Sequence, residues 1–152
     1  MHRTLGRTNK QALGITEHIM HKMIFTVKND LRGLRDKALV LLAYDSLCRR
    51  SELTSLRVNE IKYSHDGLPT HIKLCKSKTD QECLGKYIRL TTKTQIAVKE
   101  WINVAKIKEG FLFRGICNSG GLNERMSPGQ INRIYKRLAK ASCMPEELIK
   151  KY

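Results

Sequence analysis

The chain is short of acidic side chains and has no long apolar run. It has 14 Asp and Glu against 29 Lys and Arg, which gives a formal net charge of +15. So basic a folded domain indicates a polyanionic partner, with nucleic acid favoured over an anionic membrane surface. No stretch approaches the ~20 apolar residues of a membrane-spanning helix, and no signal-peptide pattern is present. We therefore expect a cytoplasmic protein with no membrane partner.

Paired cysteines and clustered metal ligands are also lacking. The five cysteines form no Cys-x-x-Cys motif, and their odd number indicates a reducing compartment without a disulfide framework. His18 and His21 are three residues apart, but a pair without further ligands is weak evidence for a metal site. The sequence thus predicts no metal and no cofactor.

The 152 residues are enough for one domain with its own core, and 41% of them are hydrophobic. Residues 1–12 are basic and aperiodic, which predicts an arm or linker, so the domain is expected to cover residues 13–152. Apolar residues at helical spacing predict helices at about residues 16–27, 34–44, 51–56 and 93–105, another after Ser127-Pro128, and a short one from Pro145.

A period of two appears only in the middle of the chain. Alternating apolar residues predict three short strands, at Ile61–Tyr63, around Ile72 to Leu74 and around Ile88 to Leu90, with a turn at Asp66-Gly67. Phe111-Leu112-Phe113 is expected to enter the core as an extended or irregular segment. The expected fold class is α+β, mostly helical, with a small three-stranded antiparallel sheet.

The most informative motif runs from Leu47 to Leu53, Leu-Cys-Arg-Arg-Ser-Glu-Leu, and is followed by Thr-Ser-Leu-Arg. It resembles the first catalytic box of the tyrosine recombinases (phage integrase family), whose pattern is Gly-Leu-Arg-x-Ser-Glu-Leu. The order of helices, small sheet and helices is similar too, from about Ala12 to Tyr152. The resemblance implies a recombinase catalytic-domain fold, truncated at its C-terminus for the reason given below.

The resemblance places Arg49 on the family's first catalytic arginine. Members cleave a DNA strand without a metal, through a tyrosine that forms a 3′-phosphotyrosyl intermediate, so the protein must balance the phosphate charge. A guanidinium is always charged and donates in a planar fork, which suits this task. Glu52 would hold Arg49 in place. The simpler interpretation of Arg49 is an exposed helix arginine paired with Glu52.

The resemblance also implies a lysine in the turn between the second and third strands, which protonates the leaving 5′-oxygen. Lys78 is the match, and Lys76 is the rival in the same loop; either could instead be an ordinary solvated lysine. Arg50 and Lys76 are further candidates for phosphate contact.

The rest of the family's active site has no counterpart in these residues. No histidine is followed three positions later by arginine, so the second box, His-x-x-Arg, is missing. The nucleophilic tyrosine follows that box in the family, which argues against Tyr152 as the nucleophile. The chain as written is therefore predicted to bind DNA without cleaving it, although its parent would be an enzyme of site-specific recombination or integration.

The helix opened by Ser127 is the candidate for reading double-stranded DNA. Side chains near its start could enter the major groove, amides reading adenine and arginine reading guanine. The candidates are Gln130, Asn132, Arg133, Lys136, Arg137 and Lys140. A solvated basic helix face is the alternative.

Three functions compete at this point. The first is an incomplete recombinase, monomeric without DNA and joined by other protomers on it. The second is a non-catalytic integrase remnant that interferes with or regulates an intact recombinase. The third is a generic basic RNA- or membrane-binding protein, which would leave the box around Arg49 and its order with the strands unexplained.

Overall fold

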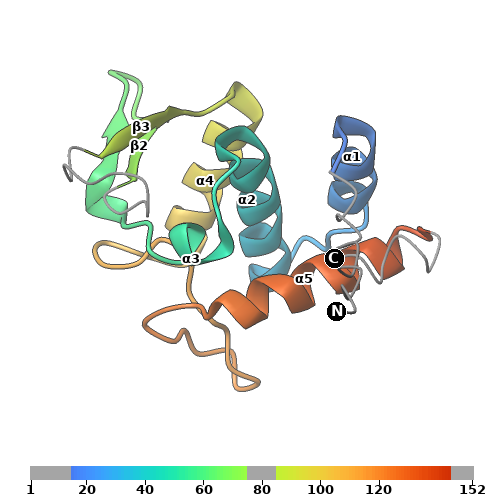
Figure 1. Cartoon of the computed structure of the whole chain (residues 1–152). Helices are drawn as coiled ribbons and strands as arrows, with labels where there is room; N and C mark the ends of the chain where they lie inside the picture. The colour runs from blue at the N-terminus through green and yellow to red at the C-terminus, as the bar shows by residue number, and fades with distance from the viewer. Residues whose placement is uncertain (1–14, 75–84, 145–152) are drawn as a thin grey trace, which may run out of the picture.

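The computed structural model describes residues 15–74 and 85–144, which form helices beside one small sheet (Figure 1). In chain order the elements are α1 (Glu17–Phe25), α2 (Leu31–Ser46), α3 (Arg50–Leu53), a short 3₁₀ turn (Val58–Glu60), β1 (Ile61–Tyr63), β2 (Pro69–Leu74), β3 (Lys86–Arg89), α4 (Thr92–Val104) and α5 (Pro128–Ala141). The predicted α+β class, mostly helical with three antiparallel strands, is confirmed. None of the helices in the described part is long and apolar enough to cross a membrane.

The connection between α1 and α2 is tighter than predicted. Asp30 caps the start of α2, because its Oδ1 accepts a hydrogen bond from the Gly33 amide at 2.7 Å. The second helix therefore begins at Leu31 rather than at residue 34, and the first ends at Phe25 rather than at Val27. Gly33 permits this tight connection, since an added Cβ would lie 1.7 Å from the Lys28 carbonyl oxygen.

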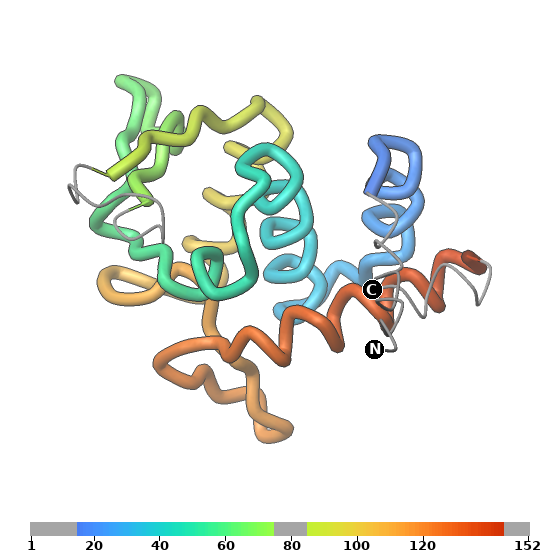
Figure 2. The backbone as a smooth tube through the Cα atoms, in the orientation of Figure 1, coloured from blue at the N-terminus to red at the C-terminus, as the bar shows by residue number. Residues whose placement is uncertain are grey.

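Helix α2 lies at the centre of the core. The apolar spacing of this helix predicts Ala38, Leu41, Leu42 and also Val40 as inward residues, and all four are buried, but so is Leu39. The helix packs against α1, α4 and β3, and Figure 2 shows it between α4 and the α1–α5 side of the molecule. A helix enclosed in this way buries more than one face, which a single stripe of apolar residues does not reveal.

The predicted helix at residues 51–56 is shorter in the structure, where α3 ends at Leu53. The carbonyl of Leu56 accepts a hydrogen bond from the Leu112 amide at 2.8 Å, and Arg57 pairs with Phe111 in an isolated bridge. The end of this segment thus pairs with a distant part of the chain in place of a last helical turn.

The sheet has the order β1-β2-β3, with both neighbouring pairs antiparallel. Ile61, Ile72 and Ile88 lie side by side across it and are buried. The confirmed strand pattern follows directly from the alternation of apolar and polar residues.

Helices α4 and α5 complete the core. Trp101 of α4 is fully buried and donates from Nε1 to the Leu112 carbonyl at 2.9 Å. The apolar residues of this helix predict Ile96 on its inner face, but Ile96 is 53% exposed, because buried Thr94, Ala97 and Val98 define that face instead. In α5 the helical spacing of Ile131, Ile134 and Leu138 predicts one inward face, and all three are buried. Leu112 and Phe113 enter the core as predicted, whereas Phe111 stays partly exposed.

Leu47, which ends α2, has an unusual backbone. Its φ and ψ of 52° and 26° are left-handed, and its side chain is 87% exposed. The family pattern that the sequence resembles has glycine at this position, and glycine adopts this conformation without steric cost.

We expect Leu47→Gly to raise the free energy of unfolding by about 0.5–1 kcal/mol, because it relieves the left-handed strain and removes no buried contact. Urea denaturation measures the change. Phe25→Gly is the matched control, since Phe25 is 93% exposed but helical, and it should destabilise the protein. A Leu47→Gly protein no more stable than the parent would contradict the prediction.

Candidate functional site

Arg49 lies at the start of α3, where Glu52 holds it at two points. The Arg49 amide donates to Glu52 Oε2 at 2.7 Å, and its guanidinium Nη1 donates to Oε1 at 3.2 Å. Glu52 is buried, whereas 59% of the Arg49 side chain is exposed. The Glu52 carboxylate thus holds the backbone amide and one guanidinium nitrogen of Arg49. The rest of the guanidinium stays open to an anionic ligand.

A hollow of about 550 Å³ lies beside Arg49. It is lined by Cys48, Arg49, Arg50 and Ser51 at the start of α3 and by Pro128 at the start of α5. Two arginines, two helix starts and an opening to solvent make this part of the surface suited to a phosphate group.

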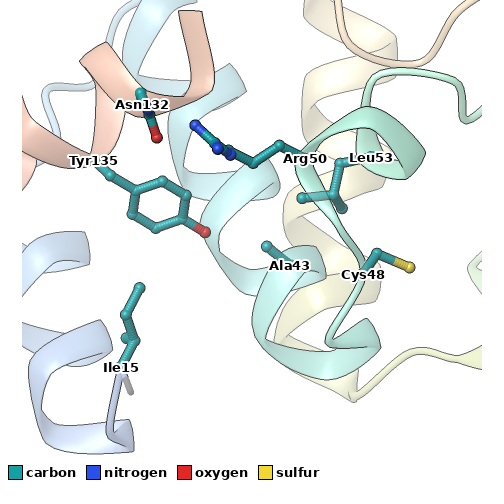
Figure 3. A pocket seen from close by; sticks show the side chains of 7 residues that line it. All are labelled: Ile15, Ala43, Cys48, Arg50, Leu53, Asn132 and Tyr135. Carbon is teal, nitrogen blue, oxygen red and sulfur yellow. The ribbon is translucent and has the colours of Figure 1, made fainter. Parts of the chain in front are cut away.

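Arg50 extends toward α5 (Figure 3). In Figure 3 its side chain reaches across a pocket into which Asn132 and Tyr135 point from α5. Ala43 of α2 and Cys48 line the same pocket. Asn132 is thus half-buried against α3 rather than fully displayed on the outer face.

The start of α5 is closed by its own side chains. The Ser127 hydroxyl accepts from the Gln130 amide at 3.3 Å, and Gln130 Oε1 accepts from the Ser127 amide at 2.8 Å. The side-chain oxygen of Gln130 is therefore occupied in capping the helix. Reading adenine with both ends of this amide would require that bond to break.

Among the predicted basic contacts of α5, Arg133, Lys136 and Lys140 are exposed and available to a ligand. Arg137 is exposed in part but is ion-paired with Asp36 of α2. Arg137 thus differs from the other basic residues of α5, because the buried carboxylate of Asp36 binds it.

Asp36 is the centre of a buried charge cluster that the sequence analysis did not identify. Arg35 donates to Asp36 Oδ1 from Nε at 3.0 Å and from Nη2 at 2.9 Å, while Arg137 pairs with Oδ2. Burial raises the pKa of Asp36, an effect that the neighbouring guanidiniums of Arg35 and Arg137 oppose. The cluster ties α2 to α5, and only their packing reveals it.

Lys76 and Lys78 lie outside the residues that the structure describes, as do the arm at residues 1–12 and the short helix predicted from Pro145. The proposed roles of the two lysines remain predictions.

Two arginines that no sequence pattern singled out meet at the far end of α3. Arg125 donates from Nε to the Thr54 carbonyl at 3.0 Å and from Nη2 to the Thr54 hydroxyl at 3.3 Å. The guanidinium carbons of Arg57 and Arg125 lie 4.4 Å and 4.8 Å from the centre of the Phe111 ring. We call Arg57, Phe111 and Arg125 the Phe111 clasp. The three residues are separated in sequence, so no local pattern predicts that they meet.

The pocket between α3 and α5 contains two ionisable groups, Tyr135 and Cys48, beside Arg50. Burial raises the pKa of Tyr135 to about 12 and also raises the pKa of the Cys48 thiol. Both groups therefore stay protonated near neutral pH. In the described part of the chain, no three His, Cys, Asp or Glu side chains are grouped as metal ligands.

Comparisons with known proteins point to one family. The model of the phage integrase family matches residues 14–148. An integrase/recombinase xerD homolog from Selenomonas ruminantium is 31% identical over 125 residues, which cover 78% of this chain and 36% of the relative.

Two solved structures share the fold. The crystal structure of the XerA recombinase has a TM-score of 0.64 and 17% identity, covering 89% of this chain and 44% of that one. The XerH site-specific recombinase bound to its difH substrate, a pre-cleavage complex, has a TM-score of 0.63 and 16% identity, covering 97% of this chain and 43% of that one. The chain thus spans less than half the length of these relatives.

The raised pKa of Tyr135 predicts a loss of stability in alkali. The phenol ionises near pH 10 in the unfolded chain but near 12 in the folded one, so raising the pH from 10 to 12 favours unfolding by up to about 3 kcal/mol. Urea denaturation at pH 9 and pH 11.5 measures this loss. Tyr135→Phe should lose less over the same interval, since both proteins share every other titration. Equal losses in the two proteins would refute the assignment.

Proposed function

The chain belongs to the phage integrase family, and on that basis we propose that it serves site-specific DNA recombination by a tyrosine recombinase, contributing the surface that binds double-stranded DNA around Arg49. The observation that carries the proposal is the guanidinium of Arg49, which is open to solvent while buried Glu52 binds both its Nη1 and the Arg49 amide. Positioning before the ligand arrives is what electrostatic stabilisation of a phosphoryl group requires.

The role proposed for Arg49 is to hold a non-bridging oxygen of the phosphate to be cleaved. The two bonds from Glu52 restrict where the guanidinium can lie, so less freedom is lost when the phosphate binds. Arg50 and Pro128 at the start of α5 line the same hollow, and Arg50 would contact a neighbouring phosphate. The exposed Arg133, Lys136 and Lys140 would extend this contact, while Arg137 would act through its pair with Asp36.

Within the same proposal, Lys78 gives a proton to the leaving 5′-oxygen, and Lys76 contacts phosphate. The complete reaction also needs a nucleophilic tyrosine and a His-x-x-Arg box, and these 152 residues contain no such box. We therefore propose that these residues alone bind DNA without cleaving it, as a cytoplasmic monomer that joins other protomers on DNA.

A second candidate function rests on the same missing box. A chain that binds recombination sites without chemistry would occupy them and interfere with an intact recombinase. Under both functions these residues alone form no covalent protein–DNA product; the two differ in whether a complete recombinase that contains these residues forms one.

Duplex binding is the first test. The logarithm of the association constant should fall linearly with the logarithm of salt, with a slope of about −0.9 for each phosphate contacted. Fluorescence anisotropy of a labelled duplex measures both quantities. Arg49→Ala should make the slope shallower by about 0.9, because Glu52 keeps its bond to the backbone amide and α3 remains capped.

The matched control is Arg32→Gln, which removes the same charge from an exposed residue at the opposite end of α2. It should leave the slope nearly unchanged. Absence of duplex binding by the parent chain, or a preference for single-stranded RNA, would overturn the proposed function.

Cleavage is the second test. Incubation with nicked duplex DNA should yield no protein–DNA species that survives denaturing electrophoresis, because no side chain here is assigned as the nucleophile. Tyr152→Phe is the control. A covalent species that forms with the parent chain and disappears in Tyr152→Phe would show that Tyr152 is a nucleophile and that the chain is catalytic.

A further inference from the structure

The Phe111 clasp has a backbone frame that does not depend on its charges. Arg57 and Phe111 face each other in an antiparallel bridge, flanked by hydrogen bonds from the Leu112 amide to the Leu56 carbonyl at 2.8 Å and from the Val58 amide to the Gly110 carbonyl at 3.0 Å. The bridge holds Arg57 opposite the ring over which its guanidinium lies. The placement of Arg57 is thus built into the fold.

Arg125 is fixed from a second direction. Its two hydrogen bonds to Thr54, which is fully buried, anchor the guanidinium to the end of α3 while it also lies over Phe111. These bonds use Nε and Nη2 and leave the donors of Nη1 without an acceptor in the described part of the chain. The guanidinium of Arg57 has no hydrogen-bond acceptor among the described residues. Donors therefore remain on both guanidiniums.

The charge of the clasp is not balanced within the described residues. The ion pairs found there involve neither Arg57 nor Arg125, both of which are exposed. Glu109 lies two residues before Phe111 and Glu124 directly precedes Arg125, yet neither forms an ion pair with the clasp in the described part of the chain. Two like charges on one ring repel each other, and the ring face offsets this only in part. An anion with several acceptor oxygens would remove the imbalance.

We propose that the Phe111 clasp is a phosphate-binding site for the DNA backbone, separate from the site at Arg49. Stacking on an aromatic ring holds a guanidinium in orientation while its N–H edge stays free, and that edge matches the oxygens of a phosphodiester. The contact positions the duplex and reads no sequence, since every phosphate offers the same oxygens.

The clasp and Arg49 lie on the two ends of one short helix. Arg49 precedes α3, and Thr54, which binds Arg125, follows it. Four helical residues span about 6 Å, and phosphates of one strand are spaced by about 3.4 Å along the axis, so one strand can reach both ends. This inference rests on the proposed function and adds a second fixed point, which sets the direction of the strand across α3.

The experiment compares Arg57→Gln with the parent chain in duplex binding over a series of salt concentrations. Arg57 makes no side-chain hydrogen bond within the described part, so its loss should leave the fold intact. We expect the salt slope to become shallower by about 0.9 and the affinity near 0.1 M salt to fall about five- to tenfold, equally for unrelated duplex sequences. Arg57→Lys keeps the charge but loses the planar fork, and its affinity should lie between the two.

Thermal denaturation of each variant separates binding from folding. If the two arginines only cover Phe111, Arg57→Gln should lower the melting temperature but leave the affinity for duplex DNA and the salt slope unchanged. This result overturns the inference. An effect no larger than that of Arg32→Gln also overturns it, because general electrostatics would then explain the loss. If the parent chain does not bind duplex DNA, the proposed function fails; if it binds but Arg57→Gln binds equally well, only the phosphate site at the clasp fails.

Discussion

The burial of α2 is the constraint on which the other elements depend. Leu39 and Leu42 on this helix are completely inaccessible, and α1, α4 and β3 pack around it. Its one buried carboxylate, Asp36, could not lie there without neutralisation, because an unpaired charge in a core costs several kcal/mol. Arg35 and Arg137 supply that neutralisation, so the demands of the core fix an arginine of α5 that would otherwise face solvent.

The end of α2 determines where Arg49 lies. The left-handed turn at Leu47 redirects the chain into α3, so that Arg49 lies at a helix start with its amide and guanidinium both bonded to Glu52. Arg125 holds the other end of α3 through Thr54. A helix of four residues has little stability of its own, and these side chains from both ends give it a fixed place.

Much of the fold could be predicted from the sequence. Helical spacing identified α1, α2, α4 and α5, and alternation identified the three strands, because each of these elements buries a regular face. The predictions were wrong where long-range contacts compete with local preference. Leu56 pairs with Leu112 instead of extending α3, and Ile96 is exposed although it lies in an apolar stretch.

By itself the sequence determined the class of fold, the excess of positive charge and the motif that places Arg49 three residues before Glu52. Each of these depends on composition or on neighbours along the chain. Only the tertiary structure decided that Arg137 pairs with Asp36 and that Arg57 and Arg125 meet on Phe111. The Asp36 and Phe111 contacts join residues far apart in sequence, so they exist only once the core has packed and fixed their backbones.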